Sequence, residues 1–233
     1  MRETDPPIST IVETRWWWVR HAPVPDGGRI YGQRDLAADC SELPVFIGLA
    51  AALPQDAVWT TSTLLRTIQT ADAIISASGG RHQPKSIVRN AGLVEQHLGD
   101  WQGLDRQAFH RERGNDAASF WFSAASERAP NGESFVDLMA RVTAAIEGIT
   151  RANAGRDIIA VTHGGTIRAA LGLALGLPPD AVHAFTIDNC ALTRIDHVHR
   201  TAPAARAVAK WRVQGVNQRP WPQDAGRKAS VHA

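Results

Sequence analysis

The segment RWWWVRHAPV, residues 15–24, constrains the fold of this chain more than any other stretch. Four consecutive apolar residues, 16–19, are followed at once by Arg20 and His21. A short run that is apolar on both faces is typical of a buried central strand in a parallel sheet. The segment therefore predicts a strand that ends by presenting an arginine and an imidazole at its carboxyl end.

Side chains alternate between the two faces of a strand, so Trp16 and Trp18 should share one face and Trp17 should lie on the other. We expect all three tryptophans to be part of the core, because large aromatic side chains contribute most when they are buried.

The rest of the chain alternates strand-like and helix-like segments, which predicts an α/β fold with helices on both faces of a mostly parallel sheet, a three-layer α/β/α sandwich. No linker-like composition divides the 233 residues. We therefore predict one domain over residues 15–217, an N-terminal tail over 1–14 and a C-terminal tail over 218–233. The predicted strands are 57–62, 86–89, 157–163 and an antiparallel pair over 184–198 and 207–217, and the predicted helices are 64–77, one that opens near Gly132, and 166–177 before Pro178 and Pro179.

Composition excludes several classes of protein. A formal net charge of +2 is too small to indicate a nucleic-acid or membrane partner. Cys40 and Cys190 form no metal-ligand spacing, which favours free thiols in a reducing compartment. The first fifteen residues lack the apolar run of a signal peptide, and no apolar segment reaches the roughly 20 residues that span a bilayer. We expect a cytoplasmic protein; the sequence does not indicate whether it forms a homodimer.

Three predicted strand ends deliver cationic and imidazole side chains. The first strand ends in Arg20 and His21, the second leads to Arg66, and the strand 157–163 ends in His163. Ligands of open α/β sheets collect at the carboxyl ends of the strands, and an arginine fork matches the oxygens of a phosphoryl group. His163 precedes Gly164, Gly165 and a helix, whose N-terminus favours an anion. The pattern predicts a phosphoryl-binding site. Taken alone, a histidine at a strand end such as His163 is more often a hydrogen-bonded structural residue, and Arg20 and His21 could simply mark where a strand reaches the surface.

Five motifs, VRHAPV, TSTLLRTIQTA, LVEQHLGDWQG, PNGESF and VTHGGTIR, occur in an order and spacing that resemble the histidine phosphatase superfamily, in the branch related to cofactor-dependent phosphoglycerate mutase. The resemblance covers about residues 15–200 and implies a three-layer α/β/α fold. It implies that His21 is the nucleophile of a phosphohistidine intermediate and that Glu95 is the general acid. By the same resemblance, the phosphoryl oxygens would be held by Arg20, Arg66 and His163, with Gly164 beside them, and Tyr31 and Gly32 would contact the substrate.

The residue types suit this chemistry. A neutral imidazole approaches a phosphate dianion better than a carboxylate does, and arginines screen the remaining repulsion. Preorganised cations also stabilise the charge on the equatorial oxygens, so the reaction needs neither a metal nor another cofactor. His197 and His199 could share a strand face as metal ligands, but no third ligand stands near them in the sequence.

Departures from the family pattern concern the substrate and the reaction. The usual glycine after the nucleophile is Ala22, whose backbone must then avoid positive φ. An asparagine that commonly contacts phosphate is replaced by Gly27, and the Glu-Arg-His-Tyr of mutases is Glu95 followed by Gln, His and Leu. The missing arginine and tyrosine favour a phosphatase acting on a small phosphorylated metabolite over a mutase. Segments 129–142 and 185–196 resemble α-ribazole phosphatases, which predicts α-ribazole 5′-phosphate as a substrate. The alternatives are a phosphoglycerate-type mutase and a protein that binds a phosphorylated ligand without turnover.

Overall fold

The computed structural model describes residues 10–114, 123–201 and 208–222. Its centre is a six-stranded sheet in the order β3-β2-β4-β1-β5-β6. Strands β1, β4, β2 and β3 pair in parallel, whereas β5 runs antiparallel to both β1 and β6. The strands are β1 (Thr10–Arg20), β2 (Ala57–Thr61), β3 (Ile87–Arg89), β4 (Asp157–Thr162), β5 (Leu192–Thr201) and β6 (Val208–Gln218). The prediction of an antiparallel pair at the end of the chain is confirmed.

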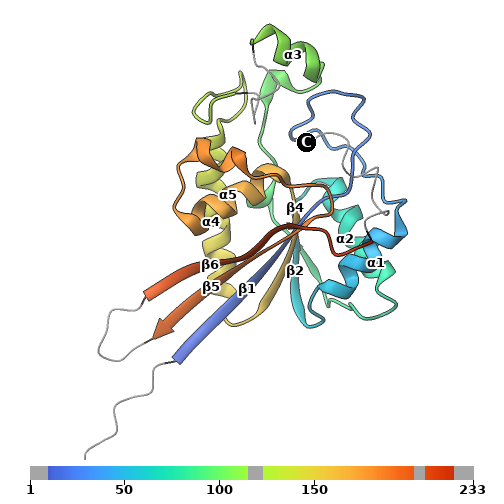
Figure 1. The fold of residues 1–233 in the computed structure, drawn as a ribbon, viewed down its shortest axis with the longest axis vertical. Helices are drawn as coiled ribbons and strands as arrows, with labels where there is room; N and C mark the ends of the chain where they lie inside the picture. The colour runs from blue at the N-terminus through green and yellow to red at the C-terminus, as the bar shows by residue number, and fades with distance from the viewer. Residues whose placement is uncertain (1–9, 115–122, 202–207, 223–233) are drawn as a thin grey trace, which may run out of the picture.

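Helices cover both faces of this sheet, which confirms the three-layer arrangement (Figure 1). Helices α1 and α2 pack on one face, while α4 and α5 pack on the other. No helix in the described ranges is both long and apolar enough to cross a membrane. The helices are α1 (Leu43–Ala52), α2 (Leu65–Ala77), α3 (Arg106–Glu112), α4 (Phe135–Ala152) and α5 (Gly164–Leu175), with 3₁₀ turns η1 (Ala91–Leu93), η2 (Gly99–Trp101) and η3 (Pro179–Ala184).

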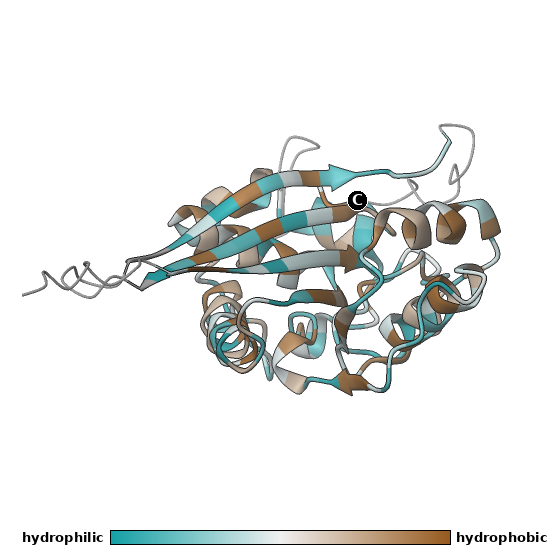
Figure 2. Ribbon diagram, turned by 90° about the horizontal axis from the view of Figure 1, so that it is seen from below, coloured by the Kyte–Doolittle hydropathy of each residue, from teal (hydrophilic) through white to brown (hydrophobic). Residues whose placement is uncertain are grey.

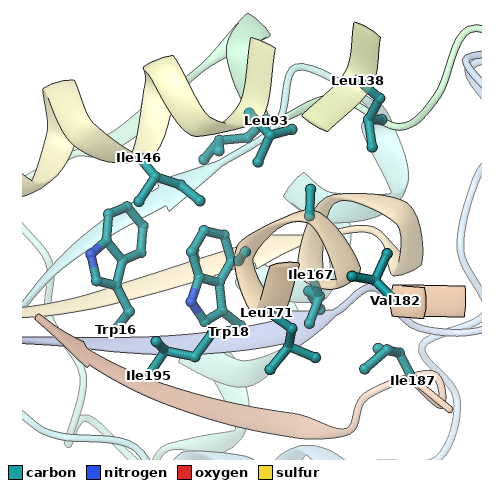
Figure 3. Close-up of a cluster of buried hydrophobic side chains, with 14 of the residues drawn as sticks. Trp16, Trp18, Leu93, Leu138, Ile146, Ile167, Leu171, Val182, Ile187 and Ile195 are labelled. Carbon is teal, nitrogen blue, oxygen red and sulfur yellow. The ribbon is translucent and has the colours of Figure 1, made fainter. Parts of the chain in front are cut away.

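The three tryptophans of β1 alternate between the faces, as the sequence predicts. Trp16 and Trp18 stack with ring centroids 4.6 Å apart, beneath side chains of α4 and α5 (Figure 3). The indole N–H of Trp16 donates to the hydroxyl of Thr150, 3.0 Å away, so its polar atom is satisfied in the core. Trp17 packs on the opposite face, with the cluster formed under α1 and α2. The tryptophans thus anchor β1 in both cores and fix where its carboxyl end lies.

Strand β1 begins earlier than the apolar run predicts, at Thr10. Its first half pairs with β5 and its second half also with β4, so residues 10–14 belong to the sheet and the predicted N-terminal tail is too long. This half is not predicted because residues 10–14 contain neither an apolar run nor a regular polar–apolar alternation, and Ile11 is 57% exposed while Thr14 is buried. Hydrophilic and hydrophobic residues are interspersed along the long strands of the sheet (Figure 2).

The predicted strand over residues 184–198 is wrong in its first half, because β5 begins only at Leu192. The preceding residues form the loop that packs behind the end of β1, where Cys190 has a positive φ of 62° that breaks the extended conformation. The helix predicted to open near Gly132 begins at Phe135, and Ser134 caps it in a capping box with Asp137. Residues 1–9 and 223–233, most of the two predicted tails, lie outside the described residues.

Candidate active site

The register of β1 and β4 places the two histidines of the predicted phosphoryl-binding site side by side. Arg20 of β1 lies opposite Thr162 of β4, so the residues that follow, His21 and His163, both leave the sheet at the same edge. The backbone N–H of His21 donates to the carbonyl of Thr162, 2.8 Å away. The two imidazole centroids are 5.3 Å apart, and both side chains are buried. The sheet itself therefore builds the centre of the site.

The hydrogen bond of His21 fixes its tautomer. Its Nδ1 lies 2.7 Å from the carbonyl oxygen of Ala22, which can only accept a hydrogen bond, so we assign the ring proton to Nδ1. Burial lowers the pKa of His21 well below its ordinary value of 6.5, and the charges of Arg66 and Arg20 lower it further. The resting imidazole is therefore neutral, with the electron pair on Nε2.

Burial is expected to make this site sensitive to acid. The folded protein disfavours protonation of His21 and His163, since burial lowers both pKa values, whereas histidines of an unfolded chain take up protons near pH 6.5. Their contribution to stability is complete above about pH 6.5 and declines as the pH falls below it. An NMR titration of the His21 ring should give a midpoint below 6.5. A midpoint at or above that value would contradict the burial argument.

Ala22 replaces the usual glycine without strain. It is not among the three non-glycine residues with positive φ in the described part of the chain, as the sequence analysis requires. Its side chain is buried, and its backbone N–H donates to the hydroxyl of Thr70 at 2.8 Å. Gly27, at the position of the missing asparagine, is exposed and has a φ of 63°. The alanine is thus compatible with the backbone geometry beside the predicted nucleophile, His21.

Arg66, in the first turn of α2, is fully buried beside the histidines. Its Nη1 donates to the carbonyl of Arg34 at 2.8 Å, and its Nη2 donates to that of Gly32 at 2.7 Å. The guanidinium carbon lies 5.1 Å from the ring centroid of Tyr31, and the Tyr31 ring is 6.4 Å from that of His21. Burial lowers the pKa of Arg66. The loop that carries Tyr31 and Gly32 thus holds Arg66 in place.

Gly32 has a structural role that the sequence analysis did not foresee. It is buried, its φ is 45°, and a Cβ atom there would lie 2.5 Å from Oε1 of Gln102. Its carbonyl orients Arg66, so the predicted contact of Gly32 with substrate stays a prediction. Tyr31 is half-buried next to His21 and keeps its place as a candidate substrate contact.

His163 contacts a residue at the end of β2. Its Nε2 lies 2.7 Å from the hydroxyl oxygen of Ser62, which follows β2 directly. Its Nδ1 is buried and has no hydrogen-bond partner among the residues that the structure describes. Burial lowers the pKa of His163 well below 6.5, and the charge of Arg66 adds to this effect. The ring is a neutral group at the centre of the predicted phosphoryl-binding cluster.

Glu95 reaches the start of α5, where Gly164 and Gly165 follow His163. Its Oε2 accepts a hydrogen bond from the backbone N–H of Gly165 at 3.2 Å, and its Oε1 accepts one from that of Gln96 at 2.9 Å. A Cβ atom on Gly165 would lie only 2.2 Å from Oε1 of Glu95. The second glycine is therefore needed for the carboxyl group to approach the helix N-terminus.

Substituting Gly165→Ala should displace the Glu95 carboxyl group and lower activity on unactivated phosphate esters by about 10- to 100-fold, because small displacements of a catalytic group cost this much. Gly148→Ala is the matched control, since no atom lies within 4 Å of a Cβ at Gly148 in α4. The control should keep full activity and gain about 0.5–1 kcal/mol of stability. Phosphate-release rates and thermal unfolding of both variants check this. Unchanged activity in Gly165→Ala would show that the position of Glu95 is not critical.

Two further residues complete the site and were not predicted to act there. Nδ2 of Asn189 donates to the carbonyl of His21 at 2.8 Å and so fixes the backbone of the predicted nucleophile. Arg168, one turn into α5, is 8% exposed and donates from Nε to the carbonyl of Phe185 at 2.9 Å. Burial, and then the charge of Arg20, lower the pKa of Arg168 to about 10. Helical periodicity from Gly164 could have identified Arg168, because residues four apart share a helix face.

Arg20 and Arg168 converge on the first glycine of α5. Nη1 of Arg20 donates to the carbonyl of Ile187 at 2.5 Å, in the same loop that binds Arg168. A Cβ atom on Gly164 would lie 3.7 Å from Nε of Arg20 and 3.3 Å from Nη1 of Arg168. The site thus gathers three arginines, two neutral histidines and one carboxyl group, an arrangement suited to binding a phosphoryl group and transferring it.

Comparison with protein families identifies the superfamily of this chain. The model of the histidine phosphatase superfamily (branch 1) matches residues 45–209, which is more than half of the chain. The chain belongs to this superfamily. The match begins after β1 and does not include Arg20 and His21, which the strand register brings beside His163.

Two curated relatives have different activities in their names. The chain is 36% identical over 214 residues to "Glucosyl-3-phosphoglycerate phosphatase" of Mycolicibacterium vanbaalenii, a match that covers 82% of this chain and 88% of the relative. It is 31% identical over 137 residues to "Probable phosphoglycerate mutase GpmB" of Yersinia enterocolitica, covering 59% of this chain and 61% of the relative. The chain thus matches less than two thirds of the mutase relative's length.

Solved structures share the fold. The structure titled "Mycobacterial hydrolase 2" aligns with a TM-score of 0.72 at 26% identity and covers 89% of this chain and 92% of its own. An α-ribazole phosphatase from Shigella flexneri aligns with a TM-score of 0.66 at 21% identity and covers 88% and 96% of the two chains. These alignments place the sheet and its helices within the phosphoglycerate mutase-like architecture.

His197, one of the two histidines considered as metal ligands, packs against Trp211, with ring centroids 4.6 Å apart.

Proposed function

We propose that this histidine phosphatase hydrolyses a small phosphomonoester through a phosphohistidine intermediate on His21. The observation that carries the proposal is the neutral His21 imidazole, whose Nδ1 is 2.7 Å from a backbone carbonyl and whose Nε2 holds an electron pair. Arg20, Arg66 and His163 surround it and can hold the phosphoryl oxygens while Nε2 attacks the phosphorus.

The first step forms a bond between Nε2 of His21 and phosphorus and breaks the bond between phosphorus and the ester oxygen. The leaving alkoxide takes a proton from the carboxyl group of Glu95 and departs as the alcohol product. In the second step the ionised Glu95 accepts a proton from water as the water oxygen attacks phosphorus. The phosphorus–nitrogen bond then breaks, phosphate departs, and neutral His21 and protonated Glu95 are restored.

The substrate of this reaction is proposed to be a phosphorylated metabolite with a polar alcohol part. The α-ribazole 5′-phosphate suggested by segments 129–142 and 185–196 stays a candidate. The relative at 36% identity adds glucosyl-3-phosphoglycerate. A mutase is the second candidate reaction, because one curated relative is named as one. Gln96, His97 and Leu98, in place of the arginine, histidine and tyrosine of mutases, favour the phosphatase.

Phosphate release tests the proposal when it is measured with a chelator on a panel of esters. The panel contains glucosyl-3-phosphoglycerate, α-ribazole 5′-phosphate, 3-phosphoglycerate, a nucleoside monophosphate, a sugar phosphate and an aryl phosphate. Turnover with a preference for one ester supports the phosphatase and names its substrate class. Phosphoryl transfer stimulated by a bisphosphorylated primer, without phosphate release, would replace it by the mutase. Tight phosphate binding without turnover of any ester would indicate a binding protein.

A further inference from the structure

One of the five sequence motifs, PNGESF, has no role in the proposed chemistry, although its glutamate contacts the loop that carries Glu95. We infer that Glu133 of this motif and Arg141 of α4 form a clamp that positions the general acid. The clamp is defined as these two side chains and their hydrogen bonds to residues 92–97. The inference rests on the proposed function, because it assigns positioning residues to the same site.

Arg141 spans the backbone of the general-acid loop. Its Nη1 donates to the carbonyls of Gly92 at 3.0 Å and Val94 at 3.1 Å, and its Nη2 lies 3.4 Å from the carbonyl of Glu95 itself. One side chain thus contacts three carbonyl groups within four consecutive residues. Because these carbonyls belong to the residues that lead into Glu95, the guanidinium fixes the path of the chain that carries the carboxyl group.

Glu133 holds Arg141 and the other end of the loop. Its Oε1 accepts a hydrogen bond from Nη2 of Arg141 at 2.7 Å and another from the backbone N–H of His97 at 2.9 Å. The backbone of Glu133 also pairs with this loop, donating to the carbonyl of His97 at 2.9 Å and accepting from Nε2 of Gln96 at 3.1 Å. Glu133 and Arg141 together therefore join the residues on both sides of Glu95 to α4 and the segment before it.

Arginine is the residue type that these contacts require. Its planar guanidinium presents five donors in a fixed fork, whereas a lysine ammonium has three donors at one point. A lysine at position 141 would keep the charge beside Glu133 but could not reach all three carbonyls together. The loop would keep a second anchor, since the hydroxyl of Thr162 donates to the carbonyl of Leu93 at 2.7 Å. Losing the fork should therefore shift the position of Glu95 without unfolding the loop.

The test compares Arg141→Lys with the native protein on two kinds of ester. The value of kcat/KM reports the steps up to alcohol release. During alcohol release an alkyl phosphate needs a proton from Glu95, whereas the phosphate of an acidic phenol needs little protonation of its leaving group. Arg141→Lys should lower kcat/KM about 10- to 100-fold on the alkyl ester and less than about 3-fold on the aryl ester, because a misplaced catalytic group loses only its own contribution.

Two comparisons separate positioning from a general structural effect. Arg128→Lys is the matched control, since Arg128 is exposed, pairs with Asp137 and makes none of the clamp contacts; it should leave both esters unaffected. In a Glu95→Gln background, Arg141→Lys should add little further loss on the alkyl ester, because the two residues act through one group. Glu133→Gln, which keeps an acceptor for His97 but removes the ion pair, should show the same ester selectivity and serves if Arg141→Lys does not fold.

Equal losses on both esters, or full additivity with Glu95→Gln, would overturn the clamp while leaving the proposed function intact. A native protein that turns over none of the esters would instead overturn the proposed function.

Discussion

Substituting His21→Ala is expected to lower kcat/KM by about 10⁴-fold or more, because removal of a covalent nucleophile costs this much in comparable enzymes. The side chain is buried at the end of β1, and its imidazole is the neutral group beside Arg66 and His163. Without Nε2 no phosphoenzyme can form, while Arg20 and Arg66 should still bind inorganic phosphate. Steady-state rates and phosphate binding, measured on the same preparation, check both halves of this expectation.

A buried histidine outside the site provides the control for this substitution. His82 is also buried, and its Nε2 lies 2.8 Å from the carbonyl of Ala50, next to Trp59 on the α1 and α2 side of the sheet. His82→Ala should lose stability but keep full activity per folded molecule. Activity of His21→Ala within tenfold of the native rate would contradict a covalent mechanism on this residue.

Substituting Glu95→Gln should give the second-largest effect, and one that depends on the leaving group. We expect kcat/KM on alkyl phosphates to fall by about 10²- to 10⁴-fold, the usual contribution of general acid catalysis. A phosphate of an acidic phenol should be affected far less, because its leaving group needs little protonation. Glutamine keeps the size of the side chain and one oxygen that can accept from Gly165, but it loses the hydrogen bond from Gln96. That loss affects both esters alike, so the difference between the alkyl and aryl esters reports the proton.

Glu147→Gln, on the exposed side of α4, serves as the matched control for removing one carboxylate and should change neither rate. Equal losses on alkyl and aryl esters in Glu95→Gln would remove Glu95 from the general-acid role. It would then hold the start of α5 in place through Gly165 without donating a proton.

The sequence predicts the buried parallel strands of this molecule better than the half-exposed parts of its sheet. The apolar run before Arg20 and the run before His163 identify buried parallel strands, because both faces of such strands must be apolar. The register of those strands then brings the two histidines together. The first half of β1 is not predicted, since it is half-exposed and its backbone pairs with β5, about 190 residues away in the chain.

The site residues also divide into those that the sequence identifies and those that only the structure shows. Arg20, His21, Arg66, His163 and Glu95 were identified because each ends a strand or belongs to a motif. The contribution of Arg168 depends on how α5 is oriented, and the clamp of Arg141 depends on hydrogen bonds to backbone carbonyls of a distant loop. Backbone carbonyls have the same chemistry at every position, so a sequence does not show which of them a buried arginine will bind.

The most direct test of the account is to trap the phosphoenzyme. The native protein is mixed with a rapidly cleaved aryl phosphate, quenched under alkaline conditions that preserve phosphohistidine, and mapped by peptide mass spectrometry. The covalent mechanism predicts one phosphoryl group on His21, absent from His21→Ala. Turnover without any phosphoenzyme, or a phosphoryl group on another residue, would contradict it.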